Sequence, residues 1–219
     1  MPRRLVVLTE EGCEVPFADM FDGVTRGVPF SVCKDDVLLL EGAAADIDPH
    51  FYNDSFGSFL CIPDIERDNR EYTQMKRFAD MGAKILGICK GAQFICVFAG
   101  GNLIQHVTGH GVLNGHSIVT QDGEYLHSSS VHHQMMDPFD LSAEQYQILA
   151  HTPKPLSKCY LDGKDREYTF PLGCKFVEPE IVWFPKIKAL AIQGHPEYMR
   201  QDAPFVQYSR KLVERYLFV

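Results

Sequence analysis

The segment from Lys84 to Gln93 holds a cysteine in a setting that could make it a nucleophile. A short apolar run leads directly into Cys89, and Gly87 and Gly91 stand two residues before and two residues after it. Glycines at these places permit a tight turn from a buried strand into a helix, a nucleophile elbow with cysteine in place of serine. Because a helix N-terminus favours a thiolate, we predict a reactive thiol at a strand end, with the backbone N–H of Lys90 directed at a developing oxyanion.

A nucleophilic thiol needs a base, and the segment from Gln193 to Glu197 offers one. His195 and Glu197 follow an apolar run, and Pro196 biases the residue before it toward an extended backbone. The two side chains can therefore project to the same side of the chain. We expect His195 to take the thiol proton while Glu197 holds its other ring nitrogen. Taken singly, the motifs have simpler interpretations, a buried cysteine at a strand end and a polar loop.

The elements that must position these residues are short apolar runs separated by helical segments. Because the runs lack strict alternation, several are expected to be buried on both faces, which is typical of parallel strands covered by helices. We therefore predict an α/β fold, an open, mostly parallel sheet between helices. The expected strands are 5–8, 37–40, 85–88, 117–120, 146–150, 181–184 and 189–192, and the expected helices are 66–81, 91–99 and about 203–216.

The length of 219 residues predicts a single domain over 1–219. Turn-forming and charged residues between His151 and Pro179 indicate a loop or hairpin excursion from that domain. Long loops of this kind are usually functional, so we expect the excursion to lie at the rim of the site and to control access or docking. In the alternative, its apolar flank packs on its own domain; this flank comprises Tyr168, Phe170, Leu172 and Phe176.

Charge and cysteine content limit the classes of partner and compartment. The chain has 21 Lys and Arg against 29 Asp and Glu, a net charge of −8, which disfavours nucleic acid and anionic membranes as partners. The 7 cysteines are odd in number and form no CxxC pair, as expected for reduced thiols. The first apolar run is too short for a signal peptide, and no run approaches the roughly 20 residues of a membrane span. We expect a cytoplasmic protein.

Several motifs in a fixed order carry a resemblance to a known family. The chain resembles the class I glutamine amidotransferases, and it is most similar to the γ-glutamyl-GABA hydrolase (γ-glutamyl peptidase) branch, which shares the basic residue after the cysteine. The motifs are Leu38 to Gly42, Asp48 to Tyr52, Arg67-Asp68, Gly87 to Gln93, Gly100 to Leu103, Ser130 to Gln134 and Gly194 to Glu197.

The resemblance implies a flavodoxin-like fold, no cofactor, and a catalytic triad of Cys89, His195 and Glu197. Such a triad hydrolyses a γ-glutamyl amide, either glutamine or a γ-glutamyl amine, through a glutamyl thioester. The resemblance further implies an oxyanion hole and a substrate pocket around the thiol. The oxyanion donors would be N–H groups of Lys90 and of the turn at Gly42 and Ala43; Gln93 would lie beside the substrate, and Ser130, Val131 and His132 near its α-carboxylate.

One departure affects the oxyanion hole. Many relatives have paired glycines in the turn, whereas Gly42 is followed here by Ala43, whose Cβ disfavours a positive φ. The second oxyanion donor therefore depends on the conformation of this turn.

The histidines invite a metal site, and His106 and His110 have i, i+4 spacing. Thr108 and Gly109 between them are poor helix formers, no HExxH glutamate is present, and no cysteine pair completes a set of ligands. We therefore expect no metal. His132 and His133 are expected to be either polar groups on the substrate side or half-buried, hydrogen-bonded side chains.

Two classes of function remain open. One is an enzyme, either a self-sufficient hydrolase of γ-glutamyl amides or a glutaminase subunit that supplies ammonia to a separate synthetase or ligase. The other is a non-catalytic binding relative, because a fold does not guarantee its chemistry. The intact cysteine, histidine and glutamate favour the enzyme.

Overall fold

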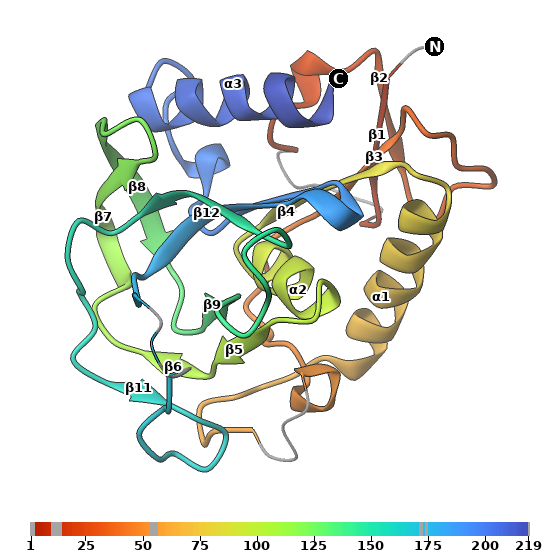
Figure 1. The fold of residues 1–219 in the computed structure, drawn as a ribbon. Helices are drawn as coiled ribbons and strands as arrows, with labels where there is room; N and C mark the ends of the chain where they lie inside the picture. Colours follow the sequence, from red (N-terminus) through yellow and green to blue (C-terminus); the bar gives the residue numbers. More distant parts are fainter. Residues whose placement is uncertain (1–2, 10–14, 53–56, 171–172, 174, 219) are drawn as a thin grey trace.

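The computed structural model describes residues 3–9, 15–52, 57–170, 173 and 175–218. Its main sheet runs in the order β2-β1-β3-β4-β13-β12-β10-β7-β8, parallel from β2 to β13 and antiparallel from β13 to β8 (Figure 1). The strands are β1 (Arg4–Val7), β2 (Gly23–Arg26), β3 (Val37–Leu40), β4 (Lys84–Ile88), β7 (Gly111–Thr120), β8 (Tyr125–Val131), β10 (Gln147–His151), β12 (Pro179–Phe184) and β13 (Ala189–Ile192).

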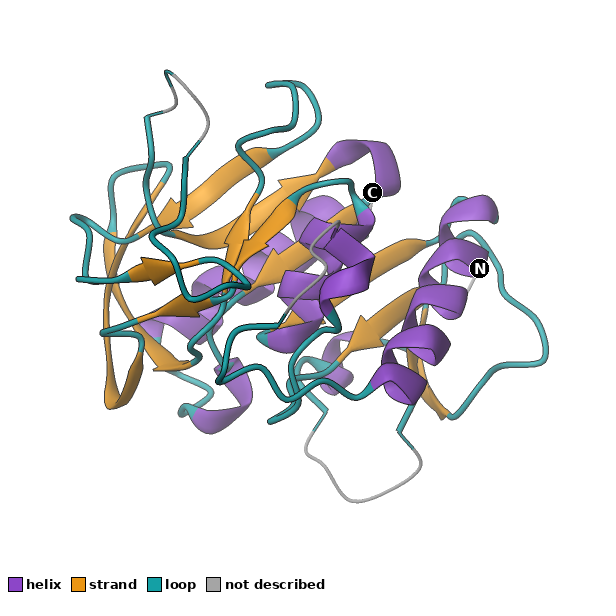
Figure 2. Ribbon diagram, turned by 90° about the horizontal axis from the view of Figure 1, so that it is seen from below, coloured by secondary structure: helices purple, strands orange, loops and turns teal. Residues whose placement is uncertain are grey.

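Helices cover both faces of this sheet because its central strands are apolar on both sides. Along β3, Leu38 and Leu40 pack with Phe78 of α1 (Ile65–Asp80) and Phe94 of α2 (Lys90–Phe98). Val37 and Leu39 point the other way and pack in the same cluster as residues of α3 (Pro204–Leu217). Figure 2 views the molecule from below, with the helices of the first face in front of the strands. The predicted α/β fold with a mostly parallel sheet is confirmed.

The predicted helices are also confirmed, with ends that differ by one residue. The carboxylate of Asp64 accepts the N–H of Arg67, 3.0 Å away, and so caps the start of α1. A proline at the first turn opens α3. The short 3-10 helices are η1 (Ala18–Met20), η2 (Pro49–Tyr52), η3 (Pro185–Ile187) and η4 (Pro196–Tyr198). Among the described residues, no helix is long and apolar enough to cross a bilayer.

The excursion after β10 packs on its own chain. Its strand β11 (Tyr160–Leu161) pairs with β6 (His106–Val107), next to the pair of β5 (Asn102–Ile104) and β9 (Met135–Asp137). Tyr168, Phe170 and Phe176 join Tyr160 in one cluster with Ile104, Val107 and Met135, while Leu172 lies outside the described residues. The apolar flank therefore follows the alternative interpretation, because β6 and β9 provide the surface that buries it.

Candidate active site

The nucleophile elbow is present at the end of β4. Cys89 has φ 50° and ψ −107°, a strained conformation for a residue with a side chain. Its N–H donates to the carbonyl of Ile192 on the neighbouring strand at 2.9 Å, and its own carbonyl accepts the N–H of Gln93 at 3.0 Å. Backbone bonds on both sides thus hold the cysteine at the N-terminus of α2.

The two glycines of the elbow are required by close approach of backbone to backbone. A Cβ on Gly87 would lie 2.4 Å from the carbonyl oxygen of Gly91. A Cβ on Gly91 would lie 2.2 Å from the carbonyl oxygen of Leu40 on β3. Both distances are far below van der Waals contact, so the sharp turn and the packing of α2 onto β3 depend on the absence of side chains.

His195 and Glu197 lie together at the end of β13. The Nδ1 of His195 is 2.7 Å from Oε1 of Glu197, and the imidazole stacks on the ring of Tyr198 with centroids 4.4 Å apart. Burial lowers the pKa of His195, but Cys89 and Glu197 outweigh burial and raise this pKa to about 9. The ring therefore favours the protonated form beside the thiol.

Ser129 of β8 fixes the backbone of the histidine. The N–H of His195 donates to Oγ of Ser129 at 2.8 Å, and the same hydroxyl donates to the carbonyl of His195 at 2.8 Å. Sequence reasoning missed this residue, because a serine on a strand that does not pair with β13 has no motif of its own. The folded arrangement of β8 and the loop after β13 brings it to the histidine.

Gly42 lies against both halves of the site. A Cβ there would be 2.7 Å from Cε1 of His195 and 3.5 Å from Cβ of Cys89. Neither Gly42 nor Ala43 has a positive φ, so the alanine after the glycine imposes no strain on the turn. Sterics and not backbone conformation require the glycine. That N–H groups of Lys90 and of this turn bind an oxyanion stays a prediction.

The side chain of Lys90 points away from solvent into a buried charge cluster. Its Nζ is 2.6 Å from Oδ1 of Asp68 and 3.1 Å from Oε2 of Glu71, and Arg67 pairs with Glu71 at 2.6 Å. Burial raises the pKa of Asp68, an effect that Lys90 opposes. Asp68 also accepts the N–H of Asp48 at 2.8 Å. The cluster ties the elbow to α1 and to the loop after β3.

The remaining predicted substrate residues are placed in different ways. Gln93 donates to the carbonyl of Gln134 at 2.9 Å from within α2. The hydroxyl of Ser130 donates to the carbonyl of His110, Val131 is exposed, and Nδ1 of His132 lies 2.8 Å from the carbonyl of Gln134. The side chains of Ser130 and His132 are thus engaged within the protein, and a role beside a substrate carboxylate stays a prediction.

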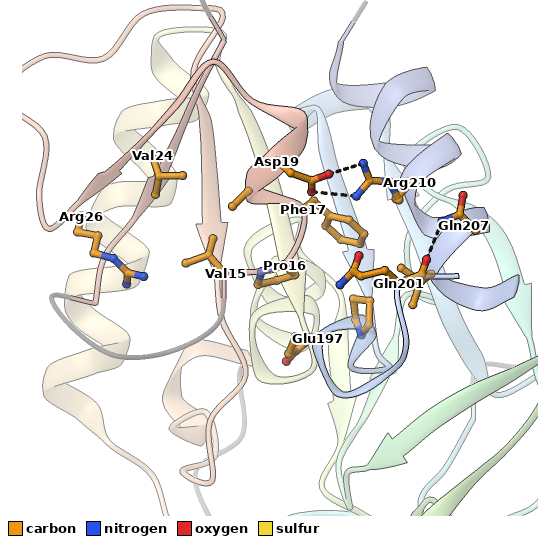
Figure 3. Close-up of a pocket in the computed structure, with 13 residues that line it drawn as sticks. Val15, Pro16, Phe17, Asp19, Val24, Arg26, Glu197, Gln201, Gln207 and Arg210 are labelled. Carbon is orange, nitrogen blue, oxygen red and sulfur yellow. Dashed lines mark hydrogen bonds and ion pairs between the residues drawn. The ribbon is translucent and has the colours of Figure 1, made fainter. Parts of the chain in front are cut away.

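Two cavities meet at Glu197. The smaller cavity has a volume of about 270 Å³. Its lining includes Gly42, Arg67, Ile88 and Tyr198, which come from separate segments of the chain. The larger, about 880 Å³, lies between β2 and α3, where Asp19 and Arg210 form an ion pair (Figure 3). Both are lined by Pro16 and Glu197. Because Gly42 lines the smaller cavity, this cavity is the better candidate for binding the reacting group of a substrate.

Comparison with known proteins assigns the family. The family model described as peptidase C26 matches residues 31–154, more than half of the chain, with the elbow inside the match. The chain belongs to the peptidase C26 family. Two curated glutamine amidotransferase-like proteins are similar to this C26 member.

The curated relatives match it over part of their length. One, from Rickettsia prowazekii, is 36% identical over 72 residues, which is 33% of this chain and 26% of the relative. The other, from Lactococcus lactis, is 27% identical over 119 residues, 54% of this chain and 45% of the relative. The matched parts thus span less than half of either relative.

Solved structures support the fold of this C26 member. A glutamine amidotransferase of Thermotoga maritima superposes with a TM-score of 0.59 at 12% identity, over 97% of this chain and 84% of that chain. A GMP synthase component of Thermoplasma acidophilum superposes with a TM-score of 0.58 at 15% identity, over 100% of this chain and 94% of that chain. The fold is that of class I glutamine amidotransferases, and the chain is glutamine amidotransferase-like.

Proposed function

We propose that this protein hydrolyses γ-glutamyl amides, with Cys89 as nucleophile, His195 as acid and base, and Glu197 as the group that orients the histidine. The observation that carries the proposal is a cysteine in a strained elbow conformation beside a histidine that is paired with a carboxylate at 2.7 Å. A reactive thiol with an oriented imidazole is the arrangement needed for acyl transfer. Lys90, the basic residue that follows the cysteine, favours the γ-glutamyl-GABA hydrolase branch, which shares this feature.

The proposed reaction has two half-reactions. The Cys89 sulfur attacks the γ-carbonyl carbon, the C–N bond breaks, and the imidazolium of His195 gives its proton to the departing ammonia or amine. A glutamyl thioester remains on the cysteine. His195 then takes a proton from water, the hydroxide attacks the thioester, the C–S bond breaks, and glutamate leaves. N–H groups of Lys90 and of the turn at Gly42 and Ala43 stabilise the oxyanion in both steps.

The test is to assay the untagged chain with glutamine and a panel of γ-glutamyl amines while measuring ammonia, free amine and glutamate. We expect equal release of glutamate and amine from at least one substrate.

Cys89→Ser should lower turnover by more than about 10³-fold, whereas Cys33→Ser, at an exposed cysteine, should not change it. His195→Ala should cost more than Glu197→Gln, since an orienting group is more replaceable than the base. Near wild-type turnover by Cys89→Ser contradicts the proposal.

A second candidate is a glutaminase subunit that passes ammonia to a separate synthetase. One fold neighbour is itself described as a component of a GMP synthase. The same assay separates the two functions. A self-sufficient hydrolase releases amine at full rate alone, whereas a glutaminase subunit shows low activity on glutamine that rises when its partner is added.

A further inference from the structure

Away from the thiol, three histidines and one glutamate meet in the interior. They are His110, just before β7, His116 within β7, His132, just after β8, and Glu180 of β12. All four are buried, with exposed fractions between 0% and 9%. One ligand atom from each lies within 4.8 Å of the ligand atoms of the other three. The reaction steps proposed above use none of these side chains, and a metal-ligand role for buried His132 would replace its predicted place beside the substrate carboxylate.

The polar atoms of this cluster face one another at ion-pair distances. The nearest ring nitrogens of His116, His110 and His132 lie 3.2, 3.4 and 4.0 Å from Oε1 of Glu180. None of these nitrogens has a hydrogen-bond partner among the described residues, and neither carboxylate oxygen of Glu180 has one. Buried carboxylates are normally paired, hydrogen-bonded or bound to a metal, and here the three imidazoles are what faces Oε1 of Glu180.

Glu178, two residues earlier, is a useful contrast. Its carboxylate accepts hydrogen bonds from Thr152, Leu156, Ser157 and Tyr160 at 2.7 to 2.8 Å. It also lies 3.2 Å from Nε2 of His110, the nitrogen that does not face Glu180. Glu178 is therefore fully satisfied by hydrogen bonds, and its contact with Nε2 of His110 leaves Nδ1 of that ring facing Glu180.

The other two rings are oriented in the same manner. The Nδ1 of His132 lies 2.8 Å from the carbonyl of Gln134, and Nδ1 of His116 lies 3.3 Å from the carbonyl of Ser117. In both, Nε2 is left facing Glu180. Rings held through one nitrogen by a carbonyl or carboxylate, with the other nitrogen aimed at a common centre, are the usual outer arrangement of a histidine metal site.

We propose that His110, His116, His132 and Glu180 bind a divalent transition metal ion, Zn²⁺ by preference, in a closed four-coordinate site. Three imidazoles and a carboxylate suit Zn²⁺, and tetrahedral ligands at about 2.0–2.2 Å from the ion lie about 3.4 Å from each other. From the 4.8 Å limit, each ligand atom moves inward by less than about 1 Å. All four protein ligands are buried, so the ion is structural.

The position of the proposed metal site determines which strands the ion would hold together. Ser129 of β8 fixes the His195 backbone, the carbonyl of Gln134 accepts from Gln93, and the N–H of Gln193 donates to the carbonyl of Glu180 at 2.8 Å. The ion would clamp β7, β12 and the segment after β8, which together form the wall behind the proposed base. We expect it to contribute to stability more than to chemistry.

The test begins with the untagged chain from zinc-supplemented cells, because a histidine tag would bind metal itself. Metal analysis should find about one Zn²⁺ per chain, and removal of the ion with a chelator should lower Tm in a manner that added Zn²⁺ reverses. Co²⁺ added to the stripped protein should give the intense visible absorption of a tetrahedral site. Failure to retain Zn²⁺, with no change of Tm on adding Zn²⁺ or Co²⁺, overturns the proposal.

Variants then assign the ligands. His116→Gln and Glu180→Gln should each lower the bound zinc to below about a tenth of the wild-type content. His127→Gln, an exposed histidine on the same hairpin, should keep it. If either ligand variant does not fold, the zinc content and the Co²⁺ spectrum of the wild-type chain decide by themselves. Undiminished zinc in both folded variants would mean that the ion binds elsewhere.

Discussion

Two neighbours of His195, Cys89 and Glu197, set the pH range of the proposed reaction. Cys89 and Glu197 raise the pKa of the imidazole to about 9, so the ring is protonated at neutral pH and loses its proton as pH rises through that value. Since the departing amine takes this proton, kcat/KM should fall above pH about 9. Glu197→Gln removes one anion and should move this alkaline limb down by roughly 1–3 pH units. A pH profile of kcat/KM for both proteins checks the shift, and identical alkaline limbs would refute it.

Gly42 offers a second test on a single residue. In Gly42→Ala the new methyl would lie 2.7 Å from Cε1 of His195, whose ring Glu197 and Tyr198 hold in place. The ring must shift, so kcat should fall by about 10²-fold. Gly23→Ala, where a Cβ meets nothing within 4 Å, is the control and should leave kcat unchanged. Equal kcat values for the two variants would show that Gly42 does not shape the site.

The contact between α2, which begins at the nucleophile elbow, and α1 depends on a buried charged side chain, Lys90. Lys90→Met would leave Asp68 and Glu71 without their shared cation and should lower the free energy of unfolding by about 3–5 kcal/mol. Lys76→Met also removes a lysine paired with a carboxylate, Asp80, but on the exposed face of α1, and should leave the urea midpoint unchanged. Urea unfolding curves of the two variants make the comparison. Similar midpoints would mean that the buried pairs add no stability.

The elements that sequence can predict are those in which a single pattern decides the outcome. β3 and β13 match their predicted ranges because every residue in them is apolar and buried. The end of β8 is recognisable as a motif but not as a strand, because serines occupy its inward positions. β2 is an exposed edge strand and carries no apolar signal.

The candidate site shows the same difference between residues that a local pattern marks and residues that only the complete fold brings together. Cys89, His195 and Glu197 can be predicted because each belongs to a short motif at a strand end. The partners of Lys90, the serine that holds His195 and the buried histidine cluster cannot be predicted, because the contacting residues come from separate segments. Only the packing of the complete fold brings them together.

On the scale of the whole molecule, the segment after β10 contributes packing. Phe176→Ala should lower the free energy of unfolding by about 1–2 kcal/mol, since this ring packs with Phe170, Tyr160 and Phe139. Phe30→Ala, at a fully exposed phenylalanine, should have no effect on the urea midpoint. Substrate kinetics of Phe176→Ala should match those of the wild-type chain. A changed KM with unchanged stability would restore a role for this segment in substrate access.

The position of β13 has a consequence for the protein during its synthesis. This strand lies between β4 and β12 although it follows both in the chain. It supplies the Ile192 carbonyl that accepts the N–H of Cys89, and His195 follows directly after it. A chain emerging from the ribosome therefore carries an ordinary cysteine until the last central strand is inserted. Contacts of such long sequence separation form late. Under the proposed mechanism, the unfinished protein therefore has no assembled nucleophile, and Cys89 meets its base only when β13 has joined the sheet.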